Sequence, residues 1–128
     1  QPQTIMSITK MFVNLFVGEL VKSKSLNLNQ KVSFYLPKIG SGYANAKVKD
    51  VLNMNIINAY TEDYTKARSS SFLHEPVGGW RLPINRDVHL SQEEFLNTIK
   101  SKKNRNLKNS TDVAFYKSAN TDVIGLII

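Results

Sequence analysis

The chain has 128 residues, 41% of them hydrophobic, which fits one globular domain with a modest core. It has no cysteine and only two histidines, which excludes disulfides, thiolate metal sites and a histidine-based metal centre, and we expect no metal or other cofactor. The net charge is +7, but the densest basic run, "KSKKNRNLKNS" at 100–110, has no interleaved aromatic residues and no nucleic-acid motif, so we interpret it as a solvated loop and expect no nucleic-acid partner.

The first predicted element is a helix from Ser7 to about Lys24. Apolar residues at 8, 11, 12, 13, 15, 16, 17, 20 and 21 cover most of a helical wheel, which predicts a central helix buried on nearly all sides. The apolar run from Met11 to Val21 is much shorter than the ~20 residues that a membrane span needs. We therefore expect no membrane span.

The middle of the chain is less regular. Residues 25–45 contain Pro37, Gly40 and Gly42, which predict a short helical or extended piece that ends in a turn-rich loop. Helical spacing of apolar residues predicts a second helix at about Ala46–Ile56. Residues 58–89 follow no period, and a long irregular segment in a compact domain is usually functional.

Two further helices are predicted near the end of the chain. Ser91 followed by Glu94 forms a capping box and predicts a helix that starts after Ser91. A last helix is predicted to begin near Asn120 or Thr121 and to be cut off at Ile128, as if the chain were the interior of a longer protein. No run alternates apolar and polar residues long enough to anchor a sheet, so the predicted fold class is mainly α.

Ser7 and Lys10 are three positions apart at the head of the first helix. Residues at i and i+3 share a helix face, and a serine hydroxyl needs an adjacent base to act as a nucleophile. The positive end of the helix dipole would also favour negative charge near Ser7. A purely structural interpretation of these residues is also possible. Ser7 would then be a first-turn residue of the helix, and Lys10 a surface charge whose stem packs on apolar neighbours. Tyr116, a third candidate introduced below, would be a core aromatic.

Longer stretches carry a family resemblance. "MSITKMFVNLFVGELVKSKSLNLNQKVSFYLPKI" resembles the first active-site block of the serine β-lactamase-like hydrolases, in which Ser-x-x-Lys opens a helix. "AKVKDVLNMNIINAYTEDYTKARSS", "GGW" and "FYKSANTDVIGLI" resemble later blocks in the same order. The chain is most similar to the esterase and 6-aminohexanoate-dimer hydrolase branch, which is related to class C β-lactamases.

This resemblance implies a serine hydrolase that cleaves an amide or ester bond of a small molecule through an acyl-enzyme on Ser7. Tyr116 would complete a triad with Ser7 and Lys10, and the sequence leaves open whether Lys10 or Tyr116 is the acylation base. Ser118, at the third position of the family's Tyr-x-Asn/Ser element, is expected to bond Lys10 or substrate. Asn120 competes for the substrate-binding role, but it also suits the N-cap of the last helix.

The same resemblance places segment 58–89 at the border of the substrate cleft. There Trp80 and Tyr64 would line an apolar pocket, or else pack in the core. His74 and His89 match no motif, and we expect both to be surface or loop residues. "MNIINAY" stands where the family usually has "MtSGi", so a glycine is lost at that loop.

One family motif is missing. The Lys-Thr-Gly or His-x-Gly element, which lies on a strand and completes the oxyanion hole, does not occur in the sequence. The resemblance therefore implies that residues 1–128 form a single helical lobe of the β-lactamase/transpeptidase-like fold, with the sheet largely or wholly missing and weak activity on their own. The alternative is a catalytically inactive, truncated helical scaffold or interaction domain. Unmatched apolar surfaces predict a homodimer.

Overall fold

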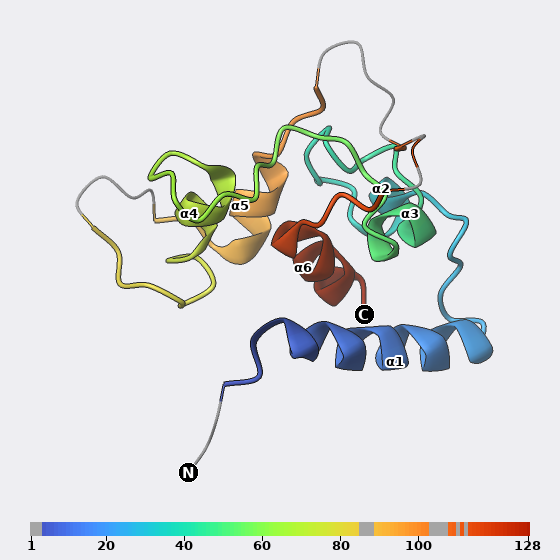
Figure 1. Ribbon diagram of the computed structural model, residues 1–128. Helices are drawn as coiled ribbons and strands as arrows, with labels where there is room; N and C mark the ends of the chain where they lie inside the picture. Colours follow the sequence, from blue (N-terminus) through green and yellow to red (C-terminus); the bar gives the residue numbers. More distant parts are fainter. Residues whose placement is uncertain (1–3, 85–88, 103–107, 110, 112) are drawn as a thin grey trace.

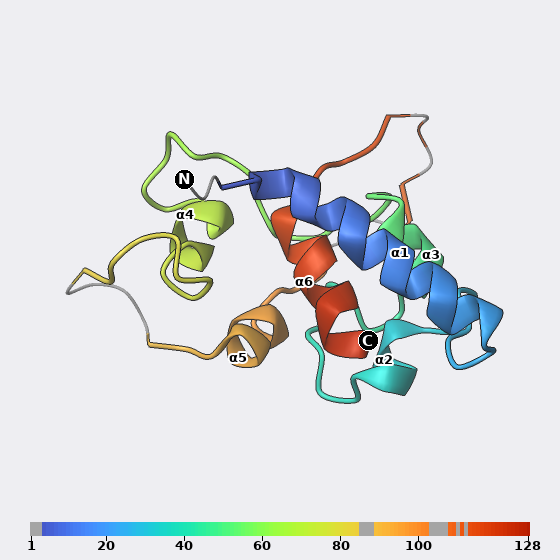
Figure 2. The ribbon, with the colours of Figure 1, turned by 90° about the horizontal axis from the view of Figure 1, so that it is seen from below.

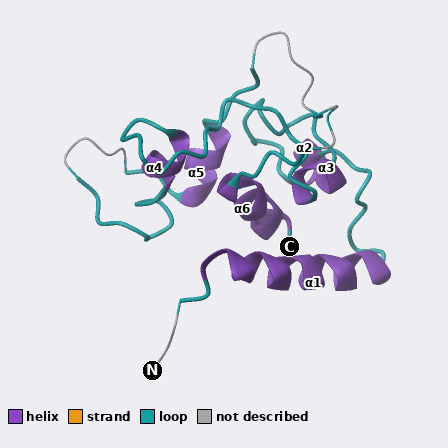
Figure 3. Ribbon diagram, in the orientation of Figure 1, coloured by secondary structure: helices purple, strands orange, loops and turns teal. Residues whose placement is uncertain are grey.

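The structure, a computed structural model, describes residues 4–84, 89–102, 108, 109, 111 and 113–128. These residues form helices joined by loops, and they contain no strand, only isolated bridges between Lys31 and Lys47 and between Ile56 and Lys108 (Figure 3). The predicted mainly α fold class is therefore confirmed. The helices are η1 Met6–Ile8, α1 Thr9–Lys22, α2 Val32–Tyr35, α3 Val48–Leu52, α4 Ser70–His74, α5 Gln92–Asn97 and α6 Ser118–Ile127.

Helix α6 lies at the centre of the fold, between α4 and α5 on one side and α2 and α3 on the other (Figure 1). It packs against α1, α3 and α5. Its start differs from the prediction, because the helix begins at Ser118 and Asn120 lies inside its first turn. The N-cap residue is Lys117, whose side chain makes no capping hydrogen bond.

Helix α1 is not the central, nearly all-buried helix that its apolar pattern predicts. Of its residues only Val17 is buried. The helix crosses over α6 along one side of the molecule (Figure 2), and one apolar face of it is largely exposed. That face carries four side chains that are more than half exposed, namely Met11, Phe12, Leu15 and Phe16. The homodimer stays a prediction, which sedimentation equilibrium tests.

The hydrophobic core lies mainly between α3, α6 and the loops that precede α3. Val48 and Val51 of α3 are fully buried, as is Val123 of α6. The chain at Gly40 approaches the end of α5 so closely that a Cβ there would lie 2.4 Å from the carbonyl oxygen of Ile99. Glycine is therefore required at this contact.

The sequence predicts the start of α5 correctly but overestimates the length of α3. Helix α3 is shorter than the predicted 46–56 helix, because Met54 adopts a positive φ of 54° that ends the helical conformation. This residue belongs to the "MNIINAY" stretch, which lacks the family's glycine. The capping box of α5 is confirmed, since Ser91 N–H donates to Glu94 Oε2 at 2.8 Å and Glu94 N–H donates to Ser91 Oγ at 3.2 Å.

Two further predictions concern a membrane span and the basic run at residues 100–110. Across the described ranges, no helix combines the length and apolar character needed to traverse a bilayer. Residues 103–107 and 110 of the basic run lie outside the described residues, so its interpretation as a solvated loop stays a prediction.

Candidate active site

The N-terminal end of α1 carries two of the predicted site residues. Ser7 lies in η1, which runs directly into α1, and Lys10 lies in the first turn of α1. The Lys10 Nζ donates a hydrogen bond to Ser7 Oγ at 3.3 Å. Just before them, Met6 has a positive φ of 46°, and Thr9 Oγ1 donates to the Met6 carbonyl oxygen at 2.7 Å. A non-glycine residue with positive φ carries backbone strain, and such residues cluster at functional sites.

Tyr116 reaches the same place from the opposite end of the chain. Its hydroxyl lies 2.7 Å from Ser7 Oγ across 109 residues of sequence. The Lys10 Nζ lies 5.3 Å from the centroid of the Tyr116 ring. The three residues therefore converge as the family resemblance implies, whereas their catalytic role stays a prediction. Tyr116 is 43% exposed, so the interpretation of this residue as a core aromatic is wrong.

The surroundings of Tyr116 make its phenol easier to ionise. Partial burial raises the pKa of Tyr116, but hydrogen bonds with Lys10, Ser7 and Ser118 and the positive charge of Lys10 outweigh burial and leave the pKa below its ordinary value. A phenol with a lowered pKa releases its proton more readily than an ordinary tyrosine does. The contacts with Ser7 and Lys10 thus favour the ionised form of Tyr116.

A cleft of about 580 Å³ opens beside Ser7 and Lys10. Trp80 and Tyr64 both line it, and they are 63% and 60% exposed, so neither packs in the core. The volume is in the range typical of small-molecule sites. The other lining residues are Met6, Thr9, Tyr60, Ser71, His74, Glu75, Gly78, Gln92, Ser118, Thr121 and Asp122.

Ser118 lines the cleft, but its side chain bonds a residue that the sequence does not single out. Its backbone N–H donates to Glu62 Oε2 at 2.9 Å, and its hydroxyl donates to Glu62 Oε1 at 2.8 Å. The Tyr64 hydroxyl donates to the same carboxylate and lies 3.4 Å from Ser118 Oγ. No local pattern marks Glu62, because its partner is 56 residues away along the chain.

Asn120 does not reach the cleft as a substrate-binding residue would. It is fully buried, and its side chain accepts a hydrogen bond from the Tyr43 hydroxyl at 2.8 Å and donates one to the Val51 carbonyl oxygen at 3.2 Å. Both expectations for Asn120, as substrate contact and as N-cap, are therefore wrong. Its position inside α6 turns the side chain toward α3 and the core instead.

The expectation for His74 is also wrong, because it is buried with 7% of its surface exposed. Its Nδ1 lies 3.2 Å from the Tyr60 hydroxyl, and its Nε2 lies 3.3 Å from Asp122 Oδ2. Burial lowers the pKa of His74 and raises the pKa of Asp122 to about 6. His89 is an exposed loop residue, as predicted. His74 is buried by residues that are distant in the sequence, so the residues beside it do not predict its burial.

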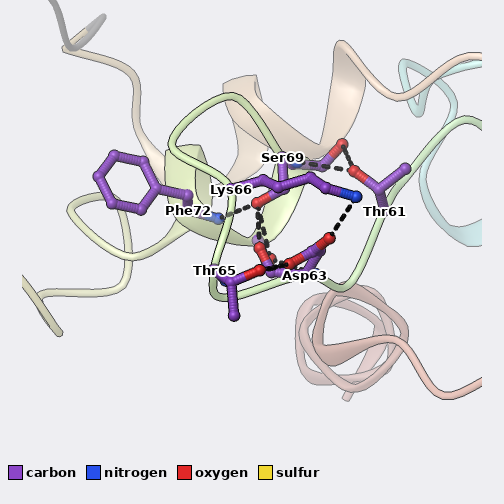
Figure 4. Close-up of polar contacts among 8 residues, drawn as sticks. Thr61, Asp63, Thr65, Lys66, Ser69 and Phe72 are labelled. Carbon is purple, nitrogen blue, oxygen red and sulfur yellow. Dashed lines mark hydrogen bonds and ion pairs between the residues drawn. The ribbon is translucent and has the colours of Figure 1, made fainter.

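The loop that carries Tyr64 is held by a network of polar contacts (Figure 4). Asp63 Oδ1 accepts hydrogen bonds from the backbone N–H and the hydroxyl of Thr65 at 3.0 and 2.7 Å, and Lys66 Nζ lies 3.0 Å from Asp63 Oδ2. The bonds from Thr65, followed by that from Lys66, hold the pKa of Asp63 at about 2. Ser69 then caps α4 by accepting a bond from an amide of its first turn. These contacts fix the turn in which Tyr64 lies.

Within the part of the chain that the structure describes, no three His, Cys, Asp or Glu side chains are grouped so that they could hold a metal ion. The arrangement beside the cleft is instead a serine hydroxyl, an amine and a phenol. These groups together are able to deprotonate a nucleophile and protonate a leaving group.

Comparison with known proteins gives an independent result. No protein-family profile matches the chain. Over 125 residues, 97% of its length, the chain is 33% identical to 6-aminohexanoate-dimer hydrolase from Paenarthrobacter ureafaciens. The chain is a distant relative of a hydrolase. It spans about 30% of the length of that relative.

Proposed function

We propose that this chain is the nucleophile-bearing helical lobe of a serine hydrolase that cleaves an amide or ester bond through an acyl-enzyme on Ser7. The observation that carries the proposal is the position of Ser7 Oγ, which lies 2.7 Å from Tyr116 Oη and 3.3 Å from Lys10 Nζ. Both Ser7 and Lys10 line the cleft. The similarity to 6-aminohexanoate-dimer hydrolase supports the same class of activity.

The geometry supports one order of proton transfer. Because the Lys10 amine donates to Ser7 Oγ, the serine proton is free to point at the Tyr116 oxygen. Ser7 Oγ then forms a bond to the substrate carbonyl carbon, and the carbonyl oxygen takes the electron pair of the broken π bond. The serine proton passes to the ionised oxygen of Tyr116, which becomes a neutral phenol. The tetrahedral intermediate breaks its C–N or C–O bond, and Tyr116 returns the proton to the leaving amine or alcohol. Water hydrolyses the acyl-enzyme by the same route and regenerates Ser7.

The cleft favours a small-molecule substrate with an apolar portion. Trp80 and Tyr64 offer aromatic surface beside Ser7, and Met6 adds an apolar side chain. A linear amide such as the dimer in the name of the relative is a suitable first substrate to test. The resemblance assigns an oxyanion donor to a strand motif that this sequence lacks. Since each such donor contributes roughly 10²–10³ in rate, we expect the 128-residue chain to react slowly by itself.

An activated ester tests the proposal directly. The chain, and any longer protein that contains it, is mixed with p-nitrophenyl acetate, and both the release of p-nitrophenol and the acetylated fraction are followed. We expect Ser7→Ala to abolish acetylation. Ser23→Ala is the matched control, because Ser23 is an exposed serine just past the other end of α1, and this variant should behave as the unmodified chain.

The alternative of an inactive scaffold makes the opposite prediction. Equal reaction of the unmodified chain and Ser7→Ala would overturn the hydrolase proposal. It would favour a helical scaffold or interaction domain.

A further inference from the structure

We propose that Glu62 is a positioning residue that keeps Tyr116 within reach of Ser7 by anchoring the first residue of α6. This inference rests on the proposed function, because it concerns the geometry of the same three groups. The carboxylate of Glu62 bonds Ser118 and the Tyr64 hydroxyl, so its effect on Ser7 passes through the segment that carries Tyr116.

The carboxylate of Glu62 takes the place of a local helix cap. Helix α6 begins at Ser118, and the side chain of the N-cap residue Lys117 makes no capping bond. The two oxygens of Glu62 instead accept the backbone N–H and the hydroxyl of Ser118, at 2.9 and 2.8 Å. Bonds to an ionised group are stronger than neutral ones, and a negative charge at a helix N-terminus is favoured by the helix dipole.

Tyr116 lies in a short segment that is tied down on both sides. Before it, the Phe115 N–H donates to the Met54 carbonyl oxygen at 2.8 Å. After it, the Lys117 Nζ donates to the Tyr60 carbonyl oxygen at 2.8 Å, and then the Glu62 contact follows. Residues 115–118 thus pack against residues 54–62, and Glu62 is the acidic member of this set of contacts.

The position of Tyr116 matters because its contact with Ser7 is short. A hydrogen bond of 2.7 Å is lost after a displacement of about 1 Å, and misplacement of that size costs roughly a hundredfold in rate at an active site. Loss of the contacts with Ser7 and Lys10 would also remove the interactions that lower the pKa of Tyr116. Glu62 further joins this end of α6 to the cleft wall, because the Tyr64 hydroxyl donates to its carboxylate.

The test measures how fast Ser7 reacts with a fluorophosphonate as a function of pH, in the full chain and its variants. We expect Glu62→Gln to slow labelling at neutral pH at least about tenfold and to move the midpoint of the pH profile upward. The glutamine can accept a bond through only one of its two terminal atoms, so one of the Ser118 contacts is lost. Labelling that slows without a shift of the midpoint would indicate a merely structural role and would overturn the inference.

Glu94→Gln is the matched control. Glu94 is also a carboxylate that caps a helix, through its 2.8 Å bond from the Ser91 N–H, and it belongs to α5 and not to the cleft. This variant should lose a similar capping interaction and keep both the rate and the midpoint. Should Glu62→Gln be unfolded at the assay temperature, Glu62→Asp is used, which keeps the charge but shortens the side chain. It should slow labelling and raise the midpoint relative to the unmodified chain, and an unchanged rate and midpoint would overturn the inference.

The outcomes separate this inference from the proposed function. Labelling that persists in Ser7→Ala would overturn the proposed function itself. Labelling that depends on Ser7 but is unchanged in rate and pH profile by Glu62→Gln would overturn only the positioning role.

Discussion

The Tyr116 hydroxyl is the single group whose removal tests the proposed chemistry most selectively. Tyr116→Phe deletes the oxygen that lies 2.7 Å from Ser7 Oγ and keeps the ring beneath Lys10. Because Tyr116 is 43% exposed, the change leaves no buried polar partner unsatisfied, and the fold should be retained. Any loss of reactivity therefore reports on the hydroxyl.

The expected magnitude distinguishes two roles of this hydroxyl. If it only orients Ser7, its loss costs one hydrogen bond, about 0.5–1.5 kcal/mol, which is at most roughly tenfold in rate. If it takes the proton of Ser7, its loss removes a general base, which typically costs about 10²–10⁴-fold, or about 3–5 kcal/mol. The two ranges do not overlap, and we expect the larger one.

Intact-mass spectrometry measures the labelling rate at several concentrations of a fluorophosphonate, and circular dichroism verifies the fold of each variant. Tyr35→Phe is the control, since the Tyr35 hydroxyl accepts a 2.9 Å bond from the Asn27 N–H away from the cleft. Labelling of Tyr116→Phe within tenfold of the unmodified chain would refute the role of Tyr116 as the proton acceptor.

Three further predictions follow from the same contacts. Lys10→Met should slow labelling about a hundredfold and move its pH midpoint upward, because the ammonium that helps to lower the pKa of Tyr116 is removed; the pH profile of labelling measures this. Burial raises the pKa of Asp122 from 3.8 to about 6, so the folded state holds this proton more tightly and the group's stabilising contribution is lost as pH rises from about 4 to about 6. Asp122→Asn should therefore raise the free energy of unfolding at pH 7 by about 1–2 kcal/mol, discounted for partial exposure, and have no such effect at pH 4 in urea titrations. Asn120→Ala should lower the free energy of unfolding by about 2–3 kcal/mol, because the Tyr43 hydroxyl and a backbone carbonyl lose their buried partner; a double variant with Tyr43→Phe should recover part of the loss.

Short-range features of this fold are predictable from the sequence. The capping box of α5 depends on two residues three positions apart, and the Ser7–Lys10 contact depends on the same spacing within one helical segment. The convergence of Tyr116 on these residues is different, because periodicity does not bring together groups 109 positions apart. Only the resemblance to a hydrolase family predicts it.

The features that sequence reasoning missed depend on tertiary contacts. The start of α6 is stabilised by Glu62 from a distant loop, so the local preference for an Asn120 cap does not determine it. His74 is buried because it stacks on Phe95 at 4.5 Å and contacts Asp122, and neither partner lies near it in the sequence. The apolar pattern of α1 indicates which faces of the helix would be stabilised by burial. It does not show whether other described residues cover those faces.

The location of the covalent adduct tests the central claim most directly. The chain is treated with a fluorophosphonate and digested, and the modified peptide is sequenced by tandem mass spectrometry. The proposal predicts that the phosphonyl group is attached to the Ser7 oxygen, that fluoride is released, and that Ser7→Ala carries no adduct. An adduct on another residue of the chain, at the same rate with and without Ser7, would contradict the assignment of Ser7 as the nucleophile.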